Sequence, residues 1–167
     1  MIADAIVSPL RRPGRPAALA ALAAAALLAA AFAFQHIGGL APCPLCIWQR
    51  WPHAAAALLG TVAFGLGGRA RPIAAALGAL VMLGGAGLAG YHVGVEQGWW
   101  AGPATCASGG DVDALSTEAL LARIRSAPVV RCDEIAWSLF GVSMAGWNAL
   151  ASLGIAALFA ADARRPR

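Results

Sequence analysis

Four long stretches of the chain carry no charged residue, and this pattern restricts the possible folds more than any other feature of the sequence. The stretches are residues 17–34, 51–68, 72–95 and 135–161. An α-helix needs about 20 predominantly apolar residues to cross a bilayer, and each stretch is close to that length or longer. Because 60% of the 167 residues are hydrophobic and only 12% are charged, a soluble domain of this size could not bury the apolar surface. We therefore expect an all-α membrane protein, folded in the lipid bilayer as a four-transmembrane-helix bundle.

The arginines give the expected helices an orientation. They occupy both tails and the short turn between the second and third helices: Arg11, Arg12, Arg15, Arg69, Arg71, Arg164, Arg165 and Arg167. Positively charged flanks stay on the cytoplasmic side of a membrane, so the N and C termini should be cytoplasmic. Because most of the positive charge lies in these flanks, the formal charge of +4 does not indicate a nucleic-acid partner, and we expect none.

This orientation divides a single membrane domain, residues 1–167, into spans and loops. The spans are expected at about 17–34, 47–68, 72–95 and 137–161, and the outer loops at about 35–46 and 96–136. An alternative for the first span is a cleavable signal peptide, although its apolar run exceeds the roughly 7–15 residues of a typical signal core. In the second outer loop, residues 114–125 have helical spacing and predict a short interfacial helix. The alternative there is an ordinary loop helix that packs on protein.

All four cysteines fall in the expected outer loops. Cys43 and Cys46 lie in the first loop, and Cys106 and Cys132 lie in the second. The non-cytoplasmic side permits disulfides, and an even number of cysteines in two pairs is typical of proteins that form them. A c-type haem site requires CxxCH and is excluded because residue 47 is isoleucine.

Two other uses of the cysteines are alternatives to exchange chemistry. A zinc site could use all four sulfurs, but the separation of Cys106 from Cys132 is not the usual CxxC spacing, and we expect no metal. Structural disulfides are the second alternative, and a Cys106–Cys132 bridge could pin the long loop. A Cys43–Cys46 bridge closes too few residues to constrain the unfolded chain much, and CxxC pairs are more typical of thiol–disulfide exchange.

The segment APCPLCIWQRWPH, residues 41–53, places the CxxC pair at the start of an expected helix. Pro44 suits the first helical position, where its missing N–H costs nothing. Cys46 would then lie in the first turn, where unpaired backbone N–H groups favour a reactive thiolate. Arg50 follows four residues later on the same face, and it could stabilise the thiolate or hydrogen-bond a carbonyl oxygen of a bound molecule. The alternative is that Arg50 only reaches to the membrane interface.

Aromatic and histidine side chains near this segment are further candidates for binding a lipid-soluble acceptor. Trp48 supplies flat apolar surface, although interfacial tryptophan also anchors membrane helices. His53 lies about two helical turns after Cys46, on the same face. His92 lies near the outer end of the third helix and could relay protons. The alternative for His92 is an interfacial histidine paired with Glu96, four residues later.

Two acidic residues follow the last cysteine. Asp133 and Glu134 are expected to raise the pKa of the Cys132 thiol by like-charge repulsion. That effect suits a sulfur that works mainly when it is released from a disulfide.

Taken together, these motifs resemble those of a known family. PCPLCIWQRWPH, then YHVGVEQGWW followed by a cysteine, then VRCDEIAW and GVSMAGWN, are similar to the DsbB family of inner-membrane, quinone-dependent disulfide-forming oxidoreductases. The resemblance covers most of the chain. It implies a bacterial inner-membrane protein with both cysteine loops on the periplasmic side. It also implies two redox partners, a periplasmic thioredoxin-fold DsbA-type protein and the membrane quinone pool (ubiquinone or menaquinone).

The resemblance further implies a role for each cysteine. The redox-active disulfides would be Cys43–Cys46 and Cys106–Cys132. Cys106 would accept the attack of the partner's thiolate and form a mixed disulfide. The released Cys132 would attack Cys43, and Cys46 would become the thiolate that faces the quinone.

Arg50 matches the arginine that the family places beside the quinone. The preceding residue is often acidic in the family, whereas this chain has Gln49, which removes a charge and is expected to alter quinone affinity or thiolate stability. The sequence therefore predicts an enzyme that reoxidises a DsbA-type thiol oxidase and passes the electrons to a quinone. One alternative is an oxidoreductase of the same chemistry dedicated to a single client. The other is a structural membrane protein whose disulfides staple its outer loops.

Overall fold

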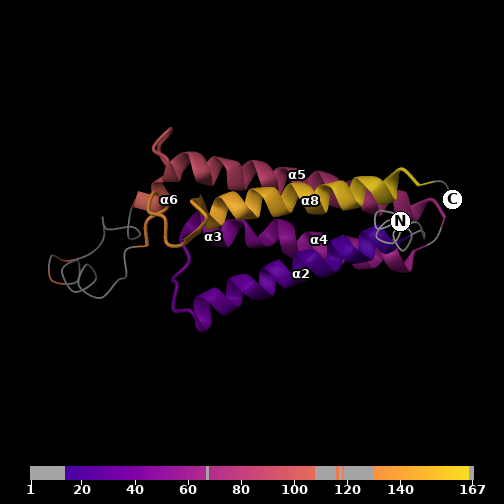
Figure 1. The fold of residues 1–167 in the computed structure, drawn as a ribbon, viewed down its shortest axis with the longest axis horizontal. Helices are drawn as coiled ribbons and strands as arrows, with labels where there is room; N and C mark the ends of the chain where they lie inside the picture. Colours follow the sequence, from indigo (N-terminus) through magenta and orange to yellow (C-terminus); the bar gives the residue numbers. More distant parts are fainter. Residues whose placement is uncertain (1–13, 67, 108–115, 117, 119–129, 166–167) are drawn as a thin grey trace.

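The computed structural model describes residues 14–66, 68–107, 116, 118 and 130–165. Within them, four long helices form most of the structure: α2 (Arg15–His36), α4 (Arg50–Gly65), α5 (Ala70–Glu96) and α8 (Met144–Ala163). The shorter elements are α3 (Pro44–Trp48), α6 (Ala104–Ala107), β1 (Ser138–Leu139) and β2 (Val142–Ser143). In Figure 1 the long helices run along the long axis of the molecule, and α3 and α6 lie toward one end.

The four long helices form a closed bundle, in which α2 packs on α4, α4 on α5, α5 on α8 and α8 on α2. Most residues of the buried core are alanines, so neighbouring helices approach closely. At Gly60 in α4, an added Cβ would lie 2.6 Å from the backbone oxygen of Ala17 in α2. At Gly78 in α5, it would lie 2.7 Å from the ring of Phe159 in α8. These two glycines are points where only a hydrogen fits between adjacent helices.

The outer surface of the bundle carries large apolar side chains, as a lipid-facing surface should. Leu22, Leu58 and Leu80 are each more than 60% exposed. Among the described residues, α2, α5 and α8 are long and apolar enough to cross a membrane, whereas α4, with 16 residues, is shorter than a usual span. A helical fold with three candidate membrane spans is therefore confirmed, while the fourth crossing and the orientation stay predictions. Most of the expected interfacial helix, 114–125, lies outside the described residues.

A buried carboxylate connects three helices at the end of the bundle opposite α3. Asp162, near the end of α8, is fully buried, and its Oδ1 accepts a hydrogen bond from the backbone N–H of Gly14 at 2.9 Å. Its Oδ2 lies 3.6 Å from Nε of Arg71 in α5. The starts of α2 and α5 and the end of α8 therefore meet at one end, so the first and last described residues are near each other (Figure 1).

The segment before α8 differs from the span expected at 137–161. Residues 138–143 form a two-stranded antiparallel hairpin instead of helix. Phe140 and Gly141 both have positive φ, 52° and 77°, which is the conformation that a two-residue hairpin turn requires. Ser143 then caps α8 through its hydroxyl oxygen, which accepts a backbone N–H of the first turn. The prediction of an all-α fold therefore needs one correction, because the described part of the chain contains a short β-hairpin.

Candidate functional site

The four cysteines gather at the end of the bundle opposite the described termini. Cys43 directly precedes α3, Cys46 lies in α3, Cys106 lies in α6, and Cys132 lies in the loop before β1. Three of them are buried in one small hydrophobic cluster, and Cys46 packs against its edge. Cys106 and Cys132 form a disulfide with Cα atoms 5.4 Å apart, whereas Cys43 and Cys46 are free thiols. The two pairs named from the sequence are thus brought to one place by three separate segments.

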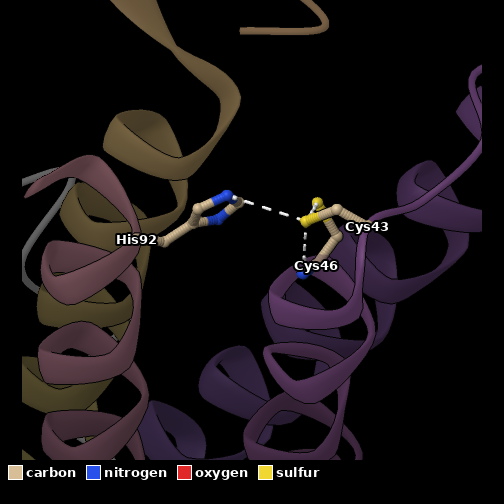
Figure 2. Close-up of side chains that lie close together, drawn as sticks. All are labelled: Cys43, Cys46 and His92. Carbon is tan, nitrogen blue, oxygen red and sulfur yellow. Dashed lines mark hydrogen bonds between the residues drawn. The ribbon is translucent and has the colours of Figure 1, made fainter. Parts of the chain in front are cut away.

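Cys43 caps the N-terminus of α3, and Pro44 occupies the first turn, so the helix begins where the sequence predicted. The backbone N–H of Cys46 donates a hydrogen bond to the Sγ of Cys43 at 3.1 Å. The two Sγ atoms are 2.8 Å apart and share a hydrogen bond (Figure 2). The sequence placed the effect of the helix N-terminus on Cys46, whereas in the structure this first-turn amide contacts the sulfur of Cys43.

The hydrogen bond between the two thiols makes their pKa values differ. Donation from Cys43 lowers the pKa of Cys46 to about 7, although burial raises it. The charge of Glu96 also raises the pKa of Cys46, and Arg50 lowers it least of the contributing groups. The same hydrogen bond, burial and the charge of Cys46 raise the pKa of Cys43. The reduced pair therefore loses its first proton from Cys46.

His92 in α5 connects the cysteine pair to the rest of the bundle. Its Nε2 lies 3.7 Å from the Sγ of Cys43 (Figure 2), and its Nδ1 lies 2.8 Å from the amide nitrogen of Gln49. Glu96, the partner considered from the sequence, instead accepts a hydrogen bond from the hydroxyl of Ser143. The histidine therefore contacts the cysteine site, and Glu96, one turn further along α5, acts on its ring only through its charge.

Sequence reasoning missed two members of this network. Gln49 is 6% exposed and was noted only for the charge that it lacks. Asn148 in α8 donates a hydrogen bond from its Nδ2 to the Oε1 of Gln49 at 2.6 Å. A polar amide within an otherwise apolar helix is the signal that could have identified Asn148, because a buried amide requires a hydrogen-bonding partner.

A cavity of about 290 Å³ opens beside the CxxC pair, close to the lower limit of about 300 Å³ for small-molecule sites. Apolar side chains form most of its wall. Its polar and sulfur-bearing members include Cys43, Cys46, Gln49, Arg50, His53, His92 and Asn148. Its aromatic members are Phe34, Trp137 and Trp147. The cavity thus combines a reactive thiol, two arginines (Arg50 and Arg131), two glutamates (Glu96 and Glu134) and a mostly apolar wall.

The remaining cofactor-binding candidates differ in their relation to this cavity. Arg50 lines it, with its guanidinium stacked 4.7 Å from the centre of the Phe32 ring. His53 also lines it and is 4% exposed, with Nδ1 3.0 Å from the backbone oxygen of Gln49. Trp48 is 46% exposed and is not among the lining residues, so the flat surface expected from it comes from Trp137 and other aromatics.

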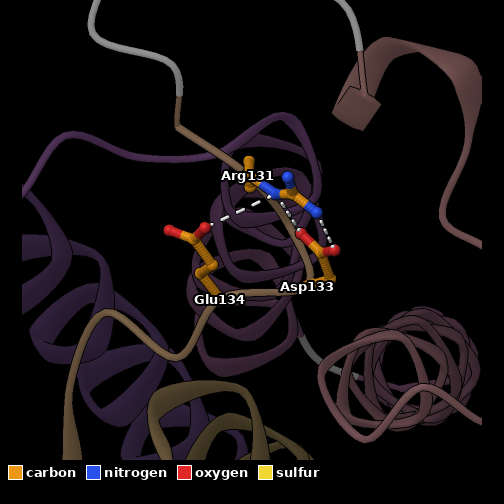
Figure 3. Close-up of polar contacts among 3 residues, drawn as sticks. All are labelled: Arg131, Asp133 and Glu134. Atoms are coloured by element: carbon orange, nitrogen blue, oxygen red, sulfur yellow. Dashed lines mark hydrogen bonds and ion pairs between the residues drawn. The ribbon is translucent and has the colours of Figure 1, made fainter.

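Three charged residues next to Cys132 in the sequence form an ion cluster. Arg131 donates two hydrogen bonds to the carboxylate of Asp133, and its Nε lies 3.5 Å from Glu134 (Figure 3). The guanidinium holds the pKa of Asp133 below its usual range. The two acidic charges expected to act on the Cys132 thiol are therefore partly neutralised by the arginine that precedes it.

The ligand atoms of Cys43, Cys46 and His92 lie within 4.8 Å of one another. Two thiolates and an imidazole are ligands that soft or borderline metal ions accept. Coordination needs the lone pair of the ring nitrogen that faces the sulfurs, so the position of the proton on His92 determines whether this group can hold a metal. The absence of a metal, expected from the sequence, stays a prediction.

Comparison with known proteins agrees with these motifs. The family "Disulfide bond formation protein DsbB" matches residues 13–161. Disulfide bond formation protein B of Verminephrobacter eiseniae is 35% identical over 169 residues, covering 94% of this chain and 92% of the relative. The protein of the same name from Azoarcus sp. strain BH72 is 36% identical, covering 90% and 92%.

A third relative matches more closely over a shorter length. Disulfide bond formation protein B of Herminiimonas arsenicoxydans is 51% identical over 74 residues, which is 44% of this chain and 46% of the relative. No solved structure matches the chain. Because the family match spans nearly all of the sequence, including both cysteine pairs and every long helix, the chain belongs to the DsbB family.

Proposed function

We propose that this chain is an inner-membrane disulfide-forming oxidoreductase that reoxidises a periplasmic DsbA-type protein and passes the electrons to a membrane quinone. The observation that carries the proposal is the meeting of both cysteine pairs at one end of an apolar bundle, with the CxxC pair beside a mostly apolar cavity. The family membership supports a membrane disulfide oxidoreductase. The partner and the quinone follow from the resemblance together with this arrangement.

The first half of the cycle uses the Cys106–Cys132 disulfide. A thiolate of the reduced partner attacks Cys106 and forms a mixed disulfide, and Cys132 leaves as a thiolate. The second thiol of the partner then displaces Cys106, so that the partner departs oxidised. Both exchanges conserve the number of disulfides, because one S–S bond forms as another breaks.

The second half moves the electrons to the CxxC pair. Cys132 attacks Cys43 in the Cys43–Cys46 disulfide, and Cys46 leaves as a thiolate. Cys106 then attacks Cys132, which re-forms the Cys106–Cys132 disulfide and releases Cys43. Once Cys43 is released as a thiol, its hydrogen bond lowers the pKa of Cys46 to about 7, so the reduced pair presents a Cys46 thiolate to the acceptor.

The cavity fits a quinone because its wall is largely apolar and Arg50 offers a fixed donor for a carbonyl oxygen. When bound, the quinone supplies an acceptor for two electrons and two protons. The chain's own contribution is to place Cys46 and Arg50 in the lining of the cavity. It also places the His92 ring beside Cys43.

The arginine flanks support an orientation in which the cysteine end faces the periplasm. In this arrangement the end of α3 and the whole of α4 supply the fourth crossing, and the cysteine pair lies just outside it. Gln49 between them keeps helical dihedrals, so the two helices are nearly continuous. The soluble partner would then approach Cys106 from outside, while the quinone enters from the bilayer.

The test is quinone reduction by the purified protein in detergent, driven by a reduced DsbA-type partner. Ubiquinone and menaquinone are supplied separately, and Cys46→Ser and Cys106→Ser variants are measured in parallel. Wild type should reduce at least one of the quinones, and both variants should fail. Partner oxidation without quinone reduction would remove the acceptor from the proposal, and failure of both reactions would favour disulfides that merely staple the loops.

A further inference from the structure

A chain of amide hydrogen bonds, centred on the buried side chain of Gln49, links three helices beside the CxxC pair. Gln49, at the junction of α3 and α4, accepts a hydrogen bond at Oε1 from Nδ2 of Asn148 in α8, at 2.6 Å. Its Nε2 donates to the backbone carbonyl of Leu45 at 3.1 Å. The same Nε2 lies 2.8 Å from Nδ1 of His92 in α5. Because buried polar groups are costly unless they are hydrogen-bonded, such a complete set of partners indicates that the orientation of Gln49 is specified.

The contacts fix which way the Gln49 amide points. An amide oxygen only accepts hydrogen bonds, and an amide nitrogen only donates them. A reversed amide would place its oxygen against the Leu45 carbonyl and its nitrogen against the nitrogen of Asn148, and both contacts would be repulsive. The two N–H groups of Gln49 are therefore directed at Leu45 and at His92.

This orientation determines where the His92 ring carries its proton. Nδ1 faces a donor and must accept, so in the neutral ring the proton is on Nε2. Nε2 is the atom 3.7 Å from the Sγ of Cys43 (Figure 2). The backbone carbonyl of Cys132 also accepts a hydrogen bond from the ring. His92 therefore lies between the sulfur of Cys43 and the backbone of Cys132, and its N–H is on the side of the ring that faces them.

We propose that Gln49 is a positioning residue that holds His92 in the tautomer whose N–H is directed at the sulfur of Cys43. The proposal rests on the proposed function and deepens it, because Cys43 is released as a thiolate when Cys106 attacks Cys132. The N–H stabilises the charge that develops on Cys43 while the ring itself stays neutral. The same proton occupies the lone pair that a metal ion would need.

Several charged or titratable groups surround this ring. Cys43 and Cys46 face it from the α3 region, and Glu96 lies one turn further along α5. Arg50 from α4, and Arg131 and Glu134 from the loop before β1, line the same cavity. A pH–rate profile would report all of them together, so the decisive measurement is the position of the proton on the ring.

The experiment is ¹⁵N NMR of the full-length reduced protein in detergent, with isotope in the histidine rings only. The chain has three histidines, so the His92 signals are assigned by their loss in His92→Asn. Wild type should show neutral His92 protonated at Nε2. In Gln49→Glu, a carboxylate that can only accept should move the neutral form to Nδ1–H. Protonation of wild-type His92 at Nδ1 would overturn the proposal, as would an Nε2–H form that persists in Gln49→Glu.

Two further variants separate positioning from general damage. Asn148→Ala removes the donor that orients Gln49 and should give a mixture of tautomers. Ser152→Ala, one helical turn further along α8, removes another buried polar group and should leave the His92 tautomer unchanged. If Ser152→Ala shifts the tautomer ratio as much as Asn148→Ala does, the specific role of Gln49 is overturned. The NMR measurement uses neither partner nor quinone, so its result does not depend on the quinone-reduction assay. If His92 has the other tautomer, the positioning role fails but the proposed electron relay does not; if the relay assay fails, the tautomer result still stands.

Discussion

At the scale of single residues, the two thiols of the CxxC pair are predicted to differ in acidity. Because donation from Cys43 lowers the pKa of Cys46 to about 7, the Cys46 thiolate is present above that pH and is lost as the pH falls through it. Alkylation of the reduced protein by iodoacetamide, followed by mass spectrometry, should show Cys46 reacting with a midpoint near pH 7. Cys43 should react only at higher pH, because its pKa is raised.

Two substitutions of Cys43 test the cause of this acidity. Cys43→Ala removes the donor and should shift the Cys46 midpoint upward toward that of an ordinary thiol. Cys43→Ser keeps a donor and should shift it less. Equal midpoints in the two variants would show that the hydrogen bond is not what lowers the pKa of Cys46.

Arg50 is predicted to act on the quinone and not on the soluble partner. Its guanidinium lines the cavity and contributes little to the acidity of Cys46. Arg50→Ala should raise the KM for quinone about tenfold, equivalent to about 1.4 kcal/mol of binding, while disulfide exchange with the partner stays near the wild-type rate. Arg50→Lys should recover only part of the loss, since an ammonium lacks the planar fork. Equal losses in the two assays would contradict this division of roles.

At the scale of the helices, close packing between α2 and α4 is predicted to depend on Gly60. A methyl group there would lie 2.6 Å from a backbone oxygen of α2, which cannot rotate away as a side chain could. Gly60→Ala should destabilise the protein by about 1–3 kcal/mol, measured as thermal unfolding in detergent. Gly87→Ala is the matched control, because nothing lies within 4 Å of its added Cβ. The control should be neutral or stabilising, and equal effects of the two substitutions would contradict the packing shown.

The elements that the sequence predicted well are those specified by neighbouring residues. The start of α3 follows from Cys43 and Pro44, and the long helices follow from their apolar runs. The start of α8 was misplaced because the hairpin turn uses Phe140 at positive φ, a conformation that bulky residues rarely adopt. No pattern of neighbouring residues led us to predict that turn.

The site was predicted less completely than the helices because its contacts cross between them. His92, Gln49 and Asn148 come from the ends of three different helices, and only the packed bundle brings them together. The pairing of His92 with Glu96 was predicted only from their spacing along one helix. In the structure each of these two side chains has partners on other segments.

At the scale of the whole molecule, the prediction concerns which end of the bundle faces which compartment. The buried Asp162 joins the starts of α2 and α5 to the end of α8, and all four cysteines lie at the other end. Since arginines flank the Asp162 end, that end should be cytoplasmic. Two exposed positions, Ala70 at the start of α5 and Ser138 in β1, can report the orientation in a chain whose native cysteines are replaced by serine.

The measurement is labelling by a membrane-impermeant maleimide in cells with a permeabilised outer membrane. Ser138→Cys should react in these cells, whereas Ala70→Cys should react only after the inner membrane is broken. Because a bundle crosses the bilayer as one unit, the opposite pattern would invert every loop and place the cysteines in the reducing cytoplasm. Labelling of both positions in sealed cells would instead mean that the Ala70 end does not reach the cytoplasm, which would contradict the four crossings.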